Sequence, residues 1–225
     1  MLLWNAFLIT FSALLPLINP LGSALVFLGL AGAAPPEVYR SMARRIAINN
    51  VIFLAIIELL GSAILNFFGI SLPIVQVSGG IVIAAIGWSV LNEKDSEANA
   101  RNKRTEAQLN ATESSRNLET KAFYPFTFPV TSGPGTLVVM LTLTARFSGG
   151  PVSQSIVRHL GLFLAVIVVS GLVYVCYAYS PYITTAISPS TAHGILRVVA
   201  FILLCIGVQI AWNGLAVLLS TVLKR

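Results

Sequence analysis

Two stretches combine proline, glycine and hydroxyl or amide side chains inside otherwise apolar segments. The first reads Asn19-Pro20-Leu21-Gly22-Ser23, and the second reads Thr131-Ser132-Gly133-Pro134-Gly135-Thr136. Proline cannot donate a helical hydrogen bond and clashes with the preceding turn, so each stretch predicts an interruption of its helix. Paired interruptions of this kind point to a binding site. We therefore predict that these residues, Leu21 excepted, form a substrate-binding site.

Each interruption also has the sequence of a helix start. Asn19 is a good N-cap with Pro20 at the first helical position, and Ser132 or Gly133 can cap a helix that begins at Pro134. A helix start presents free N–H groups and the positive end of the helix dipole. We expect the two starts to hold a small anionic group and the preceding carbonyl ends to take an ammonium group. The alternative is that both breaks are packing kinks in a structural bundle.

The composition places these breaks inside a membrane. Apolar residues make up 56% of the 225 residues, and 12 of the 22 charged residues (14 basic, 8 acidic) fall between Asn92 and Lys121. A soluble fold cannot cover its surface with the ten charges that are left, so we predict an all-α integral membrane protein. The same numbers argue against a disordered chain, a disulfide scaffold and a nucleic-acid binder. The net charge of +6 fits the basic cytoplasmic loops of membrane proteins.

The apolar stretches are long enough for six transmembrane helices, since a bilayer needs about 20 residues per helix. Their approximate bounds are Trp4–Ala31, Ile46–Phe68, Gly69–Leu91, Ala122–Ala145, Val157–Ser180 and Gly194–Ser220. We predict two three-helix units, residues 1–91 and 122–225, joined by a polar linker at 92–121. Because three is odd, the second unit must enter the membrane from the opposite side, which predicts a 3+3 inverted-topology repeat with helices 1 and 4 broken. Chance similarity of apolar strings is the alternative.

The distribution of basic residues predicts the orientation. The loops after spans one and three carry nine basic residues, and the opposite side carries four. The positive-inside bias therefore places both termini outside the cytoplasm and the long loop inside it.

Glu58 is the one acidic residue within the predicted spans. An intramembrane ionisable residue is a functional hypothesis by default, so we expect a role in coupling to a proton or sodium ion, or in binding an ammonium group. A protonated side chain satisfied by a neighbouring helix is the alternative. Gln76 and Gln209 are candidates for the transport pathway, although interhelical hydrogen bonding explains them as well.

Small residues at helical spacing predict two close-packing stripes. They comprise Gly80, Ala84 and Gly87 in span three, and Gly207, Ala211 and Gly214 in span six. These stripes leave open whether the chain forms a homo-oligomer. No metal-ligand spacing, Ser/His pair or pair of intramembrane acids occurs, so we expect no cofactor, no metal and no enzymatic activity.

At the broken spans the sequence resembles the MarC family, also called the SnatA or neutral amino acid transporter family. The resemblance covers the chain apart from the linker. It is carried by Asn19-Pro20-Leu21-Gly22, Phe68-Gly69-Ile70-Ser71, Ser78-Gly79-Gly80-Ile81, Thr131–Thr136 and Cys205-Ile206-Gly207-Val208-Gln209. It implies a bacterial or archaeal inner-membrane transporter of small neutral amino acids such as glycine, alanine or serine.

The chain departs from that family at two positions. Gln76 stands where the family often has a basic residue, and Glu58 is not part of the family motif. Two other functions stay open. One is a non-transporting membrane scaffold, and the other is an exporter of another small metabolite or drug.

Overall fold

The computed structural model describes residues 1–31, 35–92, 122–182 and 189–223. The predicted polar linker lies almost wholly outside these residues. Every regular element in the described part of the chain is helical, which confirms the predicted all-α class. The elements in chain order are α1 (Leu2–Ile18), α2 (Pro20–Ala31), α3 (Pro36–Phe67), α4 (Leu72–Asn92), η3 (Phe123–Thr131), α6 (Pro134–Phe147), α7 (Val152–Ala178) and α9 (Pro189–Leu223).

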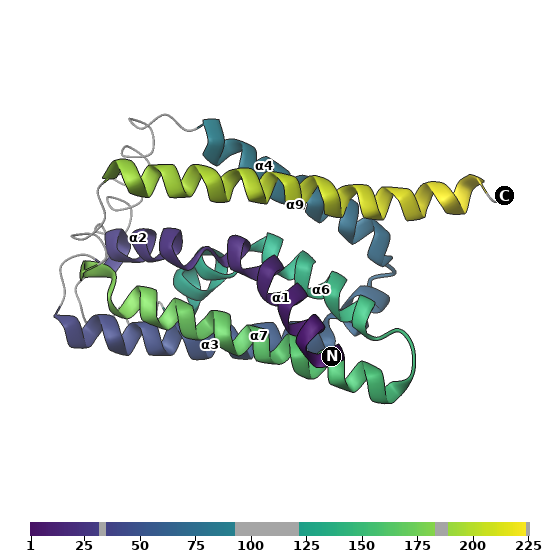
Figure 1. Cartoon of the computed structure of the whole chain (residues 1–225), viewed down its shortest axis with the longest axis horizontal. Helices are drawn as coiled ribbons and strands as arrows, with labels where there is room; N and C mark the ends of the chain where they lie inside the picture. Colours follow the sequence, from purple (N-terminus) through teal and green to yellow (C-terminus); the bar gives the residue numbers. More distant parts are fainter. Residues whose placement is uncertain (32–34, 93–121, 183–188, 224–225) are drawn as a thin grey trace.

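Successive long elements run in alternating directions along the bundle, and both ends of the chain lie toward the same end of it (Figure 1). The reversal between α3 and α4 occurs at the predicted Gly and Pro turn. Gly69 there has a φ of +65°, which a residue without a side chain adopts at little cost. Its N–H donates to the carbonyl of Asn66, and the N–H of Ile70 donates to that of Leu65, so the turn closes the end of α3.

Four described helical segments are long and apolar enough to cross a membrane. They are Leu2–Leu28, Leu72–Asn92, Val152–Ala178 and Arg197–Thr221. The pair η3 and α6 makes a fifth candidate if it is taken as one span, and it is bent by 65°. Helix α3 has 32 residues, which corresponds to about 48 Å of helix.

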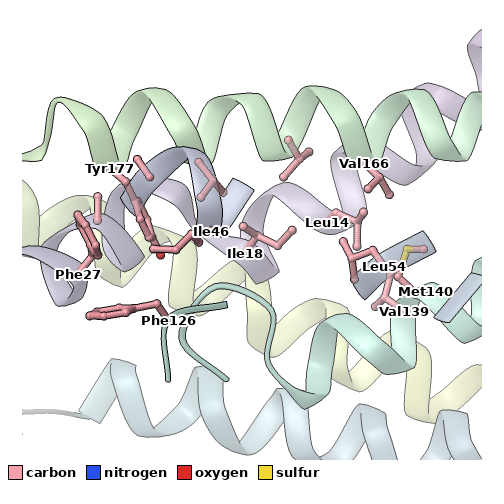
Figure 2. Packing of buried hydrophobic residues seen from close by; sticks show 14 of the residues in the cluster. Leu14, Ile18, Phe27, Ile46, Leu54, Phe126, Val139, Met140, Val166 and Tyr177 are labelled. Carbon is pink, nitrogen blue, oxygen red and sulfur yellow. The ribbon is translucent and has the colours of Figure 1, made fainter. Parts of the chain in front are cut away.

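Helix α7 lies at the centre of the packing. It contacts α1, α2 and α3, while α4 and α9 form a second closely packed pair. Figure 2 shows part of the buried apolar cluster, with Phe27, Phe126 and Tyr177 toward one end and Leu54, Val139 and Met140 toward the other. The rings of Phe27 and Tyr177 stack with centroids 4.7 Å apart, and Phe126 meets Phe27 edge-on at 5.3 Å.

Candidate functional site

The first break lies at Asn19, between α1 and α2. Asn19 has a φ of 43° in the left-handed region, and its side-chain Oδ1 accepts a hydrogen bond from the N–H of Gly22 at 3.1 Å. The predicted N-cap is therefore confirmed, with Pro20 as the first residue of α2. Pro16, by contrast, lies inside α1, which continues to Ile18. The break thus comes from the cap and Pro20 rather than from Pro16.

The second break lies between η3 and α6. The backbone of η3 is kinked, because Tyr124 and Phe128 have extended rather than helical dihedral angles. The hydroxyl of Thr127 donates to the carbonyl of Ala122, and that of Thr131 to the carbonyl of Phe126, both at 2.7 Å. Gly133 then serves as N-cap and Pro134 as the first residue of α6, as predicted. The chain changes direction by 65° across this break.

A buried hydrogen-bond chain fixes the second break to α3 and α7. The Ser132 hydroxyl donates to Oδ1 of Asn50 at 2.5 Å, and Nδ2 of Asn50 donates to the Ser170 hydroxyl at 3.0 Å. The side chains of all three residues are buried. Because buried polar groups are costly when they lack partners, this chain holds Ser132 in one place.

The hydroxyl of Tyr177 joins the two breaks. It lies 2.8 Å from the Thr131 hydroxyl, just before the second break, and it also hydrogen-bonds Ser23, just after the first. Ser23 in turn donates to the carbonyl of Asn19 at 2.9 Å. The structure therefore brings together predicted site residues that are more than 100 positions apart in the sequence.

Most of the hydroxyl side chains at the breaks are enclosed by protein. Thr131, Ser132 and Thr136 are at most 1% exposed, and Oγ1 of Thr136 is buried without a hydrogen-bond partner among the described residues. A side chain on Gly135 would meet Ile83 at 2.9 Å and Leu17 at 3.2 Å. Helices α1 and α4 thus pack over this break, and its side chains are enclosed by protein.

The comparison with protein families gives a match over almost the full length of this chain. The model of the MarC family, described as an integral membrane protein family, matches residues 4–219. The chain belongs to the MarC family. The inner membrane protein MarC of Salmonella typhimurium is 28% identical over 221 residues, which cover 92% of this chain and 93% of that protein. The MarC proteins of Citrobacter koseri and of Escherichia coli are 27% and 26% identical, with the same coverage.

No solved structure matches the chain. The names of its MarC relatives and its own apolar helices make it a multi-pass inner membrane protein. The expected MarC-family resemblance is thereby confirmed. The names of these MarC relatives state a location and do not state a substrate.

Within the described part of this MarC-family chain, none of the three pathway candidates hydrogen-bonds a residue of the breaks. Nδ1 of His159 and Oε1 of Glu58 are 3.0 Å apart, so that Glu58 pairs α3 with α7. The same two residues line a surface pocket of about 520 Å³, together with Ser148, whose hydroxyl is 3.3 Å from Nε2 of His159. Gln76 is half-buried on α4, and exposed Gln209 donates from Nε2 to Asn213 at 2.9 Å.

Sequence reasoning missed four residues that complete these contacts in the MarC-family chain. Asn50, Ser170 and Tyr177 close the network at the breaks, and His159 pairs with Glu58. One signal was available for His159, because an acid within a span is expected to have a partner and His is a residue type that can supply a charge. The other three carry no sequence signal for a role at the breaks, because a polar side chain within a span indicates interhelical hydrogen bonding, as Asn50 and Ser170 make, without identifying its partner.

Proposed function

We propose that this chain is a secondary transporter of small neutral amino acids, such as glycine, alanine or serine. In this proposal the six predicted spans, with α3 as the second, form two inverted three-helix units. The units rock against each other, so that the breaks at Asn19 and at Ser132–Gly133 face one side of the membrane and then the other. The observation that carries the proposal is the meeting of the two breaks at the Tyr177 hydroxyl.

The contact between α4 and α9 supports the inverted repeat. A methyl group on Gly80 would meet the backbone nitrogen of Ala211, and one on Gly207 would meet that of Ala84. The contacts recur further along the pair, where a methyl group on Gly87 would lie 2.7 Å from the carbonyl oxygen of Ala200, and one on Gly214 would lie 2.5 Å from that of Pro73. Such reciprocal contacts are what a two-fold axis between two related helices produces.

Contacts between the other elements support the same symmetry. Suppose that α1 corresponds to η3, α2 to α6 and α3 to α7. A contact between two of these elements then predicts a contact between the two elements that correspond to them. The contact of α1 with α7 is matched by that of η3 with α3, and the contact of α2 with α7 is matched by that of α6 with α3. The contact of α2 with η3 is likewise matched by that of α6 with α1.

The chemistry of the breaks suits a zwitterion. The first turns of α2 and α6 direct N–H groups toward the breaks, which favours a carboxylate. The Thr136 hydroxyl in the first turn of α6 is buried without a partner among the described residues, so it is available as a donor. The carbonyl ends of α1 and η3 supply acceptors for an ammonium group. A small neutral amino acid carries both groups, and the close approach of Leu17 and Ile83 to Gly135 favours a substrate with a short side chain.

The enclosed state of the breaks fits one step of alternating access. Ser132, bonded to Asn50, and Thr131, bonded to Tyr177, are closed off by α3 and α7. Opening must exchange these bonds for bonds to substrate or water. We propose Glu58 with His159 as the place where a coupling ion, a proton or sodium, acts on the packing of α3 against α7. Both termini lie outside the cytoplasm in this proposal, as the loop charges predict.

The test is transport by the purified chain in liposomes. We expect uptake of labelled alanine, glycine or serine, and exchange of internal for external alanine. Absence of both uptake and exchange, under proton and sodium gradients of either direction, would refute the proposal.

The close filling of the breaks favours a second candidate, a non-transporting membrane scaffold. Ser132 is 0% exposed, as a purely structural kink would be. The scaffold predicts that a bulkier residue at Gly133 or Gly135 harms folding without a separable loss of transport. Transport by the wild-type chain would exclude it.

A further inference from the structure

Two arginine side chains line one pocket at the end of the bundle where α1 and α7 begin and α6 ends. The pocket has a volume of about 290 Å³ and is lined by Leu2, Asn5, Ala6, Ile9, Arg146, Phe147 and Arg158. Arg146 lies in the last turn of α6, and Arg158 lies in the second turn of α7. Of the lining residues, Ala6 and Phe147 are buried, Arg158 is half-buried and Arg146 is exposed.

The positive charge of this pocket is uncompensated within the described residues. Neither Arg146 nor Arg158 forms an ion pair with a carboxylate there, and Glu58 on the adjacent face pairs with His159. The Arg158 guanidinium is held in place, because Nη1 donates to the carbonyl of Gly149 at 2.7 Å and Nη2 to Oε1 of Gln154 at 3.3 Å. Two guanidinium groups at one pocket repel each other unless an anion lies between them.

Aromatic and apolar side chains place the pocket at the edge of the membrane. Trp4 is 57% exposed on the first turn of α1 and stacks on Phe7. Tryptophan is enriched where the apolar core of the bilayer meets the headgroups. Leu2 and Ile9 supply an apolar rim beside the two arginines. The pocket therefore combines two positively charged side chains at headgroup depth with an apolar surface suited to an acyl chain.

We propose that this pocket binds the phosphate group of an anionic phospholipid. Arginine forms paired hydrogen bonds with phosphate oxygens, and the Asn5 carboxamide adds a donor. The shared chemistry is a phosphate, and the lipid is favoured over free phosphate because the rim is apolar. The site is separate from the breaks, and it does not depend on the transport proposal.

The experiment measures thermal unfolding of the purified full chain in a mild detergent. The probes are dioleoyl phosphatidylglycerol, dioleoyl phosphatidylcholine and inorganic phosphate, each titrated separately. We expect phosphatidylglycerol to raise the unfolding midpoint in a saturable manner. The variants R146Q and R158Q should each weaken its apparent affinity about tenfold, the effect of losing a charge-assisted hydrogen bond. Arg44 is exposed on α3 outside the pocket, and R44Q is the matched control.

Each outcome decides the matter. Stabilisation by phosphatidylglycerol that R146Q or R158Q weakens and R44Q leaves unchanged supports the site. Equal stabilisation by phosphatidylcholine, or equal weakening by R44Q, overturns it. If inorganic phosphate stabilised the protein saturably and to the same extent, the conclusion that the bound phosphate group belongs to a lipid would be overturned. The unfolding midpoint of each variant without lipid shows whether that variant folds. If one arginine variant does not fold, the other is sufficient for the test.

Discussion

The hydroxyl of Ser132 donates a hydrogen bond to Oδ1 of Asn50, which ties the second helix break to the middle of α3. The same Asn50 side chain donates to Ser170 on α7. One carboxamide therefore connects three elements through both of its polar atoms. Because these groups are buried, the break cannot open unless these bonds are exchanged for others.

Replacing Asn50 by leucine removes both bonds at nearly constant side-chain volume. Two buried hydroxyls then lose their partner, so we expect the free energy of unfolding to fall by about 2 kcal/mol or more. Denaturation of the purified variant in detergent measures this loss. The neighbouring half-buried Asn49 provides the control N49L, which we expect to change stability much less. Equal losses in the two variants would contradict the role assigned to Asn50.

Replacing Tyr177 by phenylalanine keeps the stacking on Phe27 and removes only the hydroxyl. We expect a loss of about 1 kcal/mol, because Thr131 and Ser23 each lose one hydrogen bond inside the protein. The control is Y174F on the half-buried Tyr174 of the same helix. Thermal unfolding distinguishes the two variants, and an unchanged midpoint in Y177F would show that this hydroxyl does not hold the breaks together.

Replacing Gly80 by alanine tests the close contact of α4 and α9. The added methyl group meets backbone of Ala211 and Gly207, so the helices must move apart, and we expect a destabilisation of about 2 kcal/mol or more. The variant G207A should behave similarly, because its contacts are reciprocal. Gly171 on α7 has open space around it, so G171A should be neutral or stabilising. A neutral G80A would contradict the packing described here.

Replacing Glu58 by glutamine tests the coupling role. We expect E58Q in liposomes to lose accumulation of labelled alanine driven by an ion gradient and to keep exchange of internal for external alanine. His159→Gln should have the same effect, because His159 is the partner of Glu58 in this interaction. Exposed Glu37, in the first turn of α3, provides the control E37Q. Full accumulation by E58Q would remove Glu58 from the coupling mechanism.

Replacing Gly135 by valine separates the transporter from the scaffold. The side chain would occupy the space beside Leu17 and Ile83, so we expect G135V to lose alanine exchange. Because the atoms it meets belong to side chains that can shift, the folded state should persist, as judged by a cooperative thermal transition. G171V, with open space on α7, should keep transport. Unfolded G135V protein would favour the scaffold.

The sequence was informative where local chemistry dictates the backbone. Proline at position 20 and at position 134, each after a residue suited to an N-cap, predicted both helix starts at the residue where they occur. The glycine and proline turn near Gly69 was predicted for the same reason. The two small-residue stripes predicted a close-packing face on α4 and another on α9, and in the structure these two faces pack against each other.

The sequence could not show how each apolar helix is rotated about its own axis, and therefore which of its side chains face the interior of the bundle. In α4 and α9 apolar residues cover nearly the whole circumference, so periodicity does not identify an inner face. Asn50 on α3 and Tyr177 on α7 likewise gave no sign that they face the breaks, whereas Glu58 within a span did indicate a partner, which His159 supplies. The backbone of η3 was also not predicted: it is extended at Tyr124 and Phe128, each of which precedes a proline, and the hydroxyls of Thr127 and Thr131 bond carbonyls five residues earlier.

The reciprocal glycine contact limits how the sequence can evolve. A crowded side chain in a core can be accommodated when its neighbour becomes smaller. At Gly80 and Gly207 the neighbouring atoms belong to the main chain, which no substitution can make smaller. Genetic suppressors of a bulky residue on one helix must therefore arise away from the facing position, where they let the whole helix tilt, and the two glycines are expected to be lost or kept together.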